Sequence, residues 1–261
     1  MREHNGEAPF AAFLDSYRAH AAGADHDLVL LLKGFSSERA KHRYRALADD
    51  VPHVTLVVGD GGYDLGSYVE AARRLSHERL CFVNSYSRIL CDGWLGHLDA
   101  ALSLPGTAMV GATGSWESHS DWRRGSWRVW PLLLRGIRAA RRDFPRFPNP
   151  HLRSNGFEIE RARWLELTTG PVLDKRRAYM LESGYHSVTR RLLDQGLRVL
   201  IVDRAGTTYD VPSWPASRTF RAGHQEGLMI ADNQTDSYLA SPPASRRLHS
   251  RAAWGRAARR L

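Results

Sequence analysis

Short apolar runs alternate with amphipathic stretches along most of the chain. Each run is rich in Leu, Val or Ile and stops at a polar or glycine-bearing loop, which is typical of buried strands. The stretches between them repeat apolar residues at three- and four-residue spacing, as helices do. The predicted strands cover 28–32, 54–58, 80–83, 109–112, 151–159 and 197–202, and the predicted helices cover 7–22, 36–49, 65–75, 92–104, 161–167 and 174–195.

This alternation predicts an α/β fold. Strands separated by helices run parallel and are joined by right-handed crossovers, so we expect an open, mostly parallel, twisted sheet flanked by helices, similar to a Rossmann fold. The carboxyl ends of parallel strands share one edge of the sheet, and open α/β sheets bind their ligands just outside that edge. The polar loops after the strands are therefore the expected functional site.

The length suits one domain over 1–238, with an insertion at about 119–150 and a basic tail at 239–261. The apolar fraction of 43% is ample for a core, and no uninterrupted apolar stretch is long enough to cross a bilayer. The N-terminal residues lack the apolar segment of a signal peptide. Cys81 and Cys91 give neither a disulfide framework nor a zinc-binding spacing, so we expect a cytoplasmic protein.

The insertion changes the composition of the chain. It interleaves Trp122, Trp127 and Trp130 with eight arginines, and 131–143 can form an amphipathic helix. Basic, aromatic segments of this kind can lie in a membrane interface, so peripheral contact with the inner face of the membrane through 122–142 is one expectation. The other is a helical insertion that covers the sheet.

The net charge of +9 raises a further alternative, a basic nucleic-acid-binding protein. No nucleic-acid-binding motif accompanies the charge, so no nucleic-acid partner is expected. The sequence also lacks a dinucleotide-binding G-x-G-x-x-G after the first strand, a P-loop, a G-x-S-x-G and an H-E-x-x-H. These absences disfavour dinucleotide oxidoreductases, P-loop NTPases, α/β-hydrolases and zincins.

The order of elements over 27–203 resembles a GT-A-type glycosyltransferase. The run Gly62 to Tyr68 resembles the G-x-D-x-x-x-Y stretch of rhamnan-synthesis-type transferases, and 80–90 falls where such enzymes carry the strand that leads into a D-x-D metal motif. Gly93-Trp94-Leu95 followed by 110–112 is similar to the "gWL … vG" spacing after that motif. The run 151–159 resembles the acceptor-side strand.

Two positions depart from the family pattern. The D-x-D position reads Asn84-Ser85-Tyr86, without a carboxylate for Mn²⁺ or Mg²⁺, and the "ED" pair reads Glu182-Ser183. The resemblance implies inverting transfer of a hexose-like sugar from a nucleotide-sugar donor to a glycan or lipid-linked acceptor in cell-envelope polysaccharide synthesis. It implies no certain cofactor, and we expect weak or no dependence on Mn²⁺ or Mg²⁺.

The predicted donor-binding residues follow the first three strands. Carboxylates beside glycines can bind base and ribose hydroxyls, amide and phenol groups can bind phosphate or sugar oxygens, and an arginine can supply the charge of a missing metal. The residues are Lys33, Asp60, Asp64, Asn84, Tyr86 and Arg88. Turn formation by Asp60, helix capping by Asp64 and a solvated Arg88 remain open alternatives.

Glu182 is the predicted general base, because inverting transfer needs a carboxylate opposite the leaving group. Its alternative role is to complement the dipole at a helix N-terminus. The expected acceptor-side residues are Glu117, His151, Arg153 and Asn155. A non-catalytic protein of the same fold that binds a nucleotide or a carbohydrate is the alternative function.

Overall fold

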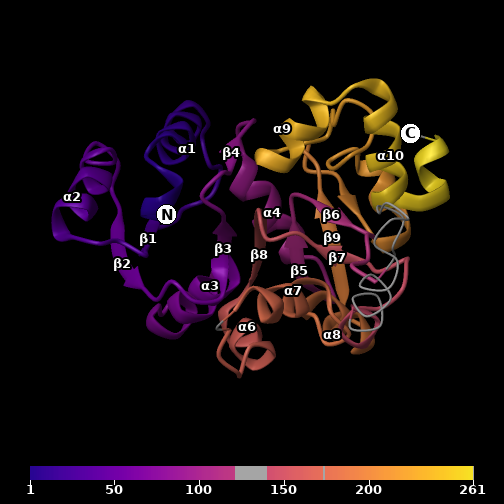
Figure 1. Cartoon of the computed structure of the whole chain (residues 1–261), viewed down its shortest axis with the longest axis horizontal. Helices are drawn as coiled ribbons and strands as arrows, with labels where there is room; N and C mark the ends of the chain where they lie inside the picture. The colour runs from indigo at the N-terminus through magenta and orange to yellow at the C-terminus, as the bar shows by residue number, and fades with distance from the viewer. Residues whose placement is uncertain (121–139, 173, 261) are drawn as a thin grey trace, which may run out of the picture.

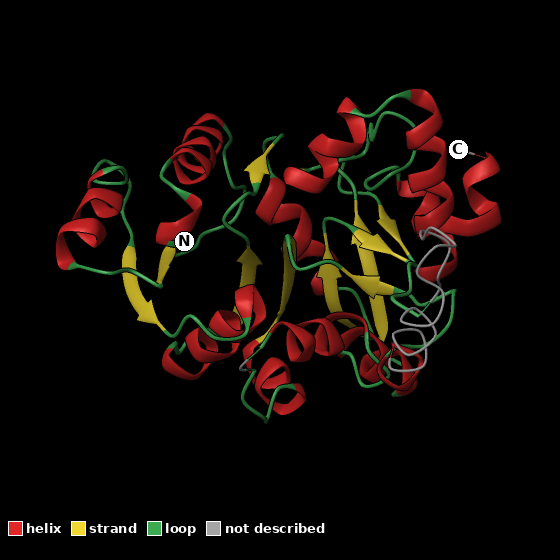
Figure 2. Ribbon diagram, viewed as in Figure 1, coloured by secondary structure: helices red, strands yellow, loops and turns green. Residues whose placement is uncertain are grey.

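The computed structural model describes residues 1–120, 140–172 and 174–260 (Figures 1 and 2). Of the predicted helix over 131–143 the structure describes only 140–143, which are helical, and most of the predicted membrane contact through 122–142 lies outside the described residues. The fold is mixed α/β, with a central sheet flanked by helices, as the sequence predicts.

The main sheet has five strands in the order β10-β9-β5-β8-β3. Their bounds are β3 Arg79–Val83, β5 Thr107–Gly111, β8 Gly156–Glu160, β9 Arg198–Val202 and β10 Thr208–Tyr209. β5 and β9 are parallel, whereas β8 is antiparallel to both of its neighbours, β3 and β5. Because β3 and β5 are both antiparallel to β8, they run in the same direction as each other. β9 is parallel to β5, so the carboxyl ends of β3, β5 and β9 share one edge of the sheet.

A separate parallel pair is formed by β1 (Val29–Lys33) and β2 (Val54–Val58), joined by α2 (Glu38–Ala46). Ser37 caps α2 by accepting a hydrogen bond from the backbone N–H of Ala40. β1 and β3 are both fully described, and no ladder of hydrogen bonds joins them. The pair therefore stands apart from the main sheet, at the left of Figure 1.

Short strand pairs tie distant loops together near the carboxyl edge. β4 (Arg88–Ile89) pairs with β11 (Ile230–Ala231), and β6 (Gly114–Ser115) pairs with β7 (His151–Leu152). Both pairs are antiparallel. They hold the segments after β3 and β5 against segments from later in the chain.

Helices cover both faces of the main sheet. One apolar cluster joins the sheet to α3 (Tyr63–Arg74), α6 (Arg161–Leu167), α7 (Lys175–Ser183) and α8 (Val188–Asp194), which lie along the lower side of Figure 1. The other joins it to α1 (Ala8–Ala19) and α4 (Trp94–Leu102). Neither face of the central strands is therefore open to water, which matters for the charged residue that β8 carries.

The C-terminal segment packs onto this body. It contains α9 (Asn233–Ala240) and α10 (Pro243–Trp254), with short 3₁₀ helices over Val211–Ser217 and Gly255–Arg260. Trp254 is 1% exposed, and its indole N–H donates to the carbonyl of Phe220 at 2.7 Å. The described part of the basic tail is thus anchored in the apolar core.

Three local predictions are wrong in detail. The predicted strand over 151–159 is interrupted after Leu152, because the chain turns at 153–155 to supply polar side chains to a buried network. The predicted helix over 174–195 is two helices, since Ser187 caps a new helix by accepting from Arg190 N–H. The helix predicted to begin at 92 begins at Trp94 with Gly93 as its N-cap, and the Asp92 carboxylate accepts from the backbone N–H of Ala21.

Candidate functional site

A cavity of about 380 Å³ lies between β1 and β3, the two strands that do not pair. Side chains of α1, α3 and α4 also line it. At the carboxyl ends of β1 and β3 the lining is polar and includes Lys33, Asp64 and Asn84. The structure therefore brings these three predicted donor-binding residues to one cavity.

Lys33 and Asp64 form an ion pair at this polar end. Lys33 Nζ lies 2.8 Å from Asp64 Oδ1, and the lysine is 5% exposed. Asp64 is in the first turn of α3 but does not cap it, because the N-cap is Gly62. Gly62 has a φ of +73°, and a Cβ there would lie 1.9 Å from the carbonyl oxygen of Val172, so only glycine fits the turn that presents Asp64.

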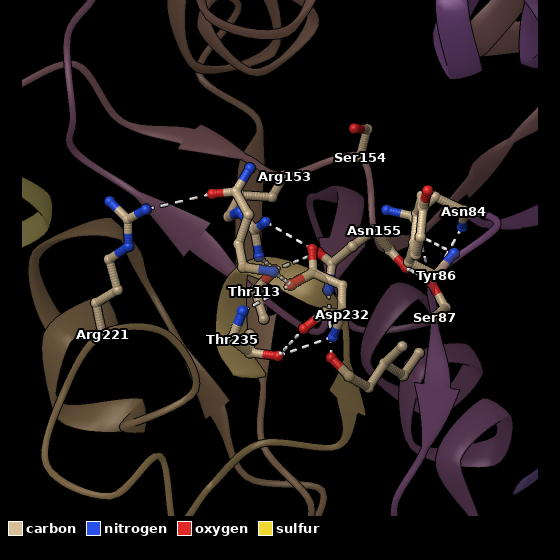
Figure 3. A network of polar contacts seen from close by, with 12 residues as sticks. Asn84, Tyr86, Ser87, Thr113, Arg153, Ser154, Asn155, Arg221, Asp232 and Thr235 are labelled. Carbon is tan, nitrogen blue, oxygen red and sulfur yellow. Dashed lines mark hydrogen bonds and ion pairs between the residues drawn. The ribbon is translucent and has the colours of Figure 1, made fainter. Parts of the chain in front are cut away.

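Asn84 stabilises its own turn at the end of β3. Its Oδ1 accepts from the backbone N–H of Tyr86 at 2.9 Å and lies 3.2 Å from the Ser87 hydroxyl oxygen (Figure 3). Within the described residues, no group of three or more His, Cys, Asp or Glu side chains could hold a metal ion. Asn84, Ser85 and Tyr86 supply no carboxylate at the position of the D-x-D motif, and Asn84 Oδ1 is already engaged in its own turn.

A buried network continues from this turn. The Ser87 hydroxyl donates to the carbonyl of Asn155 at 2.7 Å, and the Asn155 side chain accepts from the Thr113 hydroxyl and donates to the carbonyl of Ile230 at 3.2 Å (Figure 3). Asn155 is 1% exposed. The network fixes the turn between β7 and β8 against the ends of β3 and β5.

Arg153 is the cation of this network. Its Nη2 lies 2.6 Å from Asp232 Oδ2, both side chains are almost fully buried, and its guanidinium lies 4.1 Å from the centre of the Phe220 ring. The other oxygen of Asp232 accepts from the backbone N–H groups of Gln234 and Thr235 and so caps α9. Asp232 thus serves as a structural anchor for the segment after β11.

Glu182 is held beside the same turn. Its Oε1 accepts from the backbone N–H of Ser154 at 2.9 Å, while the carbonyl of Ser154 accepts from the Tyr68 hydroxyl at 3.2 Å. Tyr68 lines the cavity. Glu182 lies in the last turn of α7, not at a helix N-terminus, so the alternative role of complementing a helix dipole is wrong.

The remaining predicted residues lie outside the cavity lining and have other partners. Asp60 pairs with Arg2 at 2.7 Å, Arg88 reaches both carboxylate oxygens of Asp236, and Glu117 pairs with Arg221 at 2.8 Å. His151 is buried, with Nδ1 2.9 Å from the carbonyl of Asn149. Tyr86 is 38% exposed. Arg88 is therefore partly exposed but paired, and it ties the segment after β3 to α9.

The cavity also contains a residue that sequence reasoning did not select, Glu158. It is 3% exposed, and burial, reinforced by the charge of Asp99, raises its pKa from 4.5 to about 7. Glu158 lies between Phe157 and Ile159, and this alternation is typical of a strand with one solvent-exposed face. The signal that could have identified it is the number of predicted helices, which is large enough to cover both faces of the sheet. A strand covered on both faces has no solvent-exposed face, so a charged residue in it is buried.

The comparisons with known proteins give distant matches only. No protein-family model and no curated protein matches the sequence. Among solved structures, mouse xyloside xylosyltransferase 1 in its apo form is similar at 14% identity and a TM-score of 0.38, over 77% of this chain and 81% of that chain. The inositol-1-phosphate CTP transferase of T. maritima is similar at 11% identity and a TM-score of 0.39, over 87% of this chain and 77% of that one. Likenesses of this size assign no activity to the chain.

Proposed function

We propose that this protein is a glycosyltransferase that moves a sugar from a nucleotide-sugar donor to a glycan or lipid-linked acceptor. The observation that carries the proposal is the position of Ser154. Its carbonyl accepts from Tyr68 of the cavity wall, and its N–H donates to Glu182. Glu182 does not itself line the cavity and is joined to its wall through Ser154, so the proposal requires an acceptor hydroxyl that reaches the Glu182 carboxylate from beside the cavity.

The polar end of the cavity suits the ribose and diphosphate of a donor. An ammonium group carries three donors, and the contact with Asp64 uses one of those on Lys33. Asp64 is 36% exposed in its side chain and can accept from ribose hydroxyls. Lys33 would stabilise the charge that develops on the leaving diphosphate, the kind of effect that often dominates catalysis of group transfer.

Glu182 would act as the general base. The acceptor hydroxyl oxygen attacks the anomeric carbon, its proton passes to the Glu182 carboxylate, and the bond between the anomeric carbon and the diphosphate oxygen breaks, so the nucleoside diphosphate leaves with the electron pair. The hydrogen bond from Ser154 N–H fixes one carboxylate oxygen. A base oriented in this way raises the rate of proton transfer.

The biological setting is part of the proposal. A cell-envelope polysaccharide or its lipid-linked precursor, made at the inner face of the membrane, remains our proposed acceptor. In the described parts of the chain, no helix combines the length and apolar character needed to cross a bilayer. Peripheral contact through 122–142 stays a prediction.

The test combines donor binding with turnover. We expect one nucleotide sugar in a screen, with or without Mn²⁺, to raise the melting temperature, because a ligand that binds only the folded state stabilises it. Glu182→Gln should keep that rise and lower turnover by roughly 10²- to 10⁴-fold, the usual contribution of a general base. Glu166→Gln, an exposed carboxylate on α6, is the matched control. A screen in which no nucleotide sugar changes the melting temperature contradicts the proposal.

One observation favours a second candidate, a non-catalytic protein that binds a nucleotide or a carbohydrate. The asparagine at the position of the metal motif is engaged in its own turn. Such a protein would bind the donor equally well with Gln at position 182 and would show no transfer in either form. Measured transfer by the unaltered chain excludes it.

A further inference from the structure

α3 and α7 pack against each other (Figure 1), and exposed aromatic side chains lie where the two helices meet. Tyr63, the first residue of α3, is 48% exposed, and Tyr179 of α7 is 37% exposed. The ammonium nitrogen of Lys175 lies 5.5 Å from the centre of each of these two rings. The ring of His119 lies 5.0 Å from that of Tyr179. All four residues are exposed, and we call them the tyrosine strip.

The tyrosine strip connects two groups that the proposed function uses. Tyr63 directly precedes Asp64, which lines the polar end of the cavity. Along α7, Tyr179 lies four positions after Lys175 and three before Glu182, so these three residues share one face of the helix. A molecule that lies on the strip therefore extends from the polar end of the cavity to the proposed base.

Tyr63 has a backbone conformation that core packing does not explain. Its φ is +54°, in the left-handed region that glycine adopts most easily and that Asn and Asp tolerate best among the other residues. The ring is almost half exposed and belongs to neither apolar cluster of the core. Residues held in such conformations cluster at binding and catalytic sites. The exposed ring at position 63 is therefore a candidate ligand contact.

Lys175 carries a positive charge that no carboxylate balances within the described parts of the chain. Tyr179, and to a smaller extent Tyr63, raises the pKa of its ammonium group, and no acidic side chain contributes. The neighbouring Arg176, in contrast, is paired with Asp143 at 2.8 Å. The strip therefore presents one available cation between two aromatic rings.

A sugar that carries a carboxylate matches these groups. One face of a sugar ring consists of C–H groups and packs on an aromatic ring as other apolar surfaces do. A carboxylate attached directly to the sugar ring lies at the edge of that ring, so it can reach an ammonium group beside the aromatic side chain and form a charge-assisted hydrogen bond. A neutral sugar would use the rings alone.

We propose that the tyrosine strip binds the acceptor, and that this acceptor is an acidic glycan that contains uronic acid residues. A sugar ring stacks on Tyr63, its carboxylate contacts Lys175, and the glycan continues along Tyr179 to present a hydroxyl group to Glu182. The acceptor thus reaches the base from beside the cavity. The inference rests on the proposed function and adds to it the class of acceptor.

The test measures, by calorimetry at low salt, the binding of tetragalacturonate and of its methyl ester, which has the same sugar rings without the charge. Tetragalacturonate should bind roughly threefold to fivefold more tightly than the ester, the contribution of one exposed ion pair. Lys175→Gln should remove this preference. Lys41→Gln, which removes a lysine charge from α2, is the matched control and should keep it.

Tyr63→Asn separates a binding role from a structural one. It should weaken the binding of both tetrasaccharides by roughly threefold to tenfold, because the stacking surface is lost. The melting temperature should not fall, since Asn tolerates a left-handed backbone better than Tyr does. Tyr63→Phe keeps the ring and should keep the binding. A Tyr63 that served only the fold would give the opposite result, a lower melting temperature with unchanged affinity.

Three results overturn the inference: no binding of either tetrasaccharide, equal binding of both, or a preference that survives Lys175→Gln. None of them bears on the proposed function, which is judged by the response of the melting temperature to nucleotide sugars and by the turnover of Glu182→Gln. If no nucleotide sugar changes the melting temperature, the proposed function fails, and tight binding of tetragalacturonate would then describe a glycan-binding surface without transfer.

Discussion

Two polar regions of the molecule differ in whether their buried charged side chains are paired. In the network around the β7–β8 turn, Arg153 faces Asp232, and Asn155 bonds on both sides of its amide. Along the cavity, Glu158 is buried with no hydrogen-bond partner on Oε2 among the described residues, and the nearby cation Arg79 contacts Asp99 instead. The charges of the first region are paired, so that region stabilises the fold, whereas the buried carboxylate of the second region destabilises the ionised protein.

Breaking the charge pair of the first region should have the largest effect on stability. Asp232→Asn keeps a side chain that can cap α9 but leaves the Arg153 charge buried beside neutral groups. We expect a loss of about 3–5 kcal/mol in the free energy of unfolding, measured by urea denaturation, since losing one partner of a buried pair leaves an uncompensated charge. A loss below about 1 kcal/mol would show that water reaches Arg153.

Removing the buried charge of Glu158 should stabilise the folded protein, whereas Asp232→Asn should destabilise it. For Glu158 the folded-state pKa of about 7 lies above the ordinary 4.5, so the folded protein holds the proton more tightly than the unfolded chain does. Its cost to stability is therefore absent below pH 4.5, grows as the pH rises from 4.5 to 7, and is complete above 7. At pH 8 it amounts to about 3 kcal/mol.

Glu158→Gln should accordingly stabilise the free protein at pH 8 by up to about 3 kcal/mol and leave the stability below pH 4.5 nearly unchanged. Urea denaturation across pH 4–8 measures the difference, and Glu160→Gln serves as the exposed control on the same strand. Equal stabilisation at both ends of the pH range would mean that packing, not ionisation, separates the variants.

The smallest effect is expected where a pair is exposed. Arg88 and Asp236 contact each other with side chains 37% and 50% exposed. Asp236→Asn should change the free energy of unfolding by less than about 1 kcal/mol, because water and salt screen such pairs. A larger loss in the free energy of unfolding, measured by urea denaturation, would mean that the exposed part of α9 stabilises the fold as Asp232 does.

Local pattern predicts the strands and most helices well and their partners poorly. The apolar run 54–58 matches β2 residue for residue, and the run at 80–83 differs from β3 by one position. The antiparallel direction of β8 could not be read from the sequence, because alternation reports which face a residue occupies and says nothing of strand direction. The split of the helix at Ser187 shows that a cap can outweigh continuous periodicity.

The sequence places the expected site at the carboxyl edge of the sheet, and the cavity contains only part of the predicted set of residues. Lys33, Asp64 and Asn84 follow strand ends, which is why the sequence identifies them, and the cavity places them together. Asp232 and Thr113 belong to the network through contacts that span many residues, and no local spacing announces such contacts. The roles of all these residues remain predictions that the variants above test.

The place of β8 also governs the order in which the protein can assemble. β3 and β5 emerge early during synthesis, yet neither pairs with the other; each waits for residues 156–160 to arrive between them. Until then both leave an edge open, and unpaired edges invite association with other chains. We therefore expect the nascent first half of the chain to need chaperones until residues 156–160 have been synthesised.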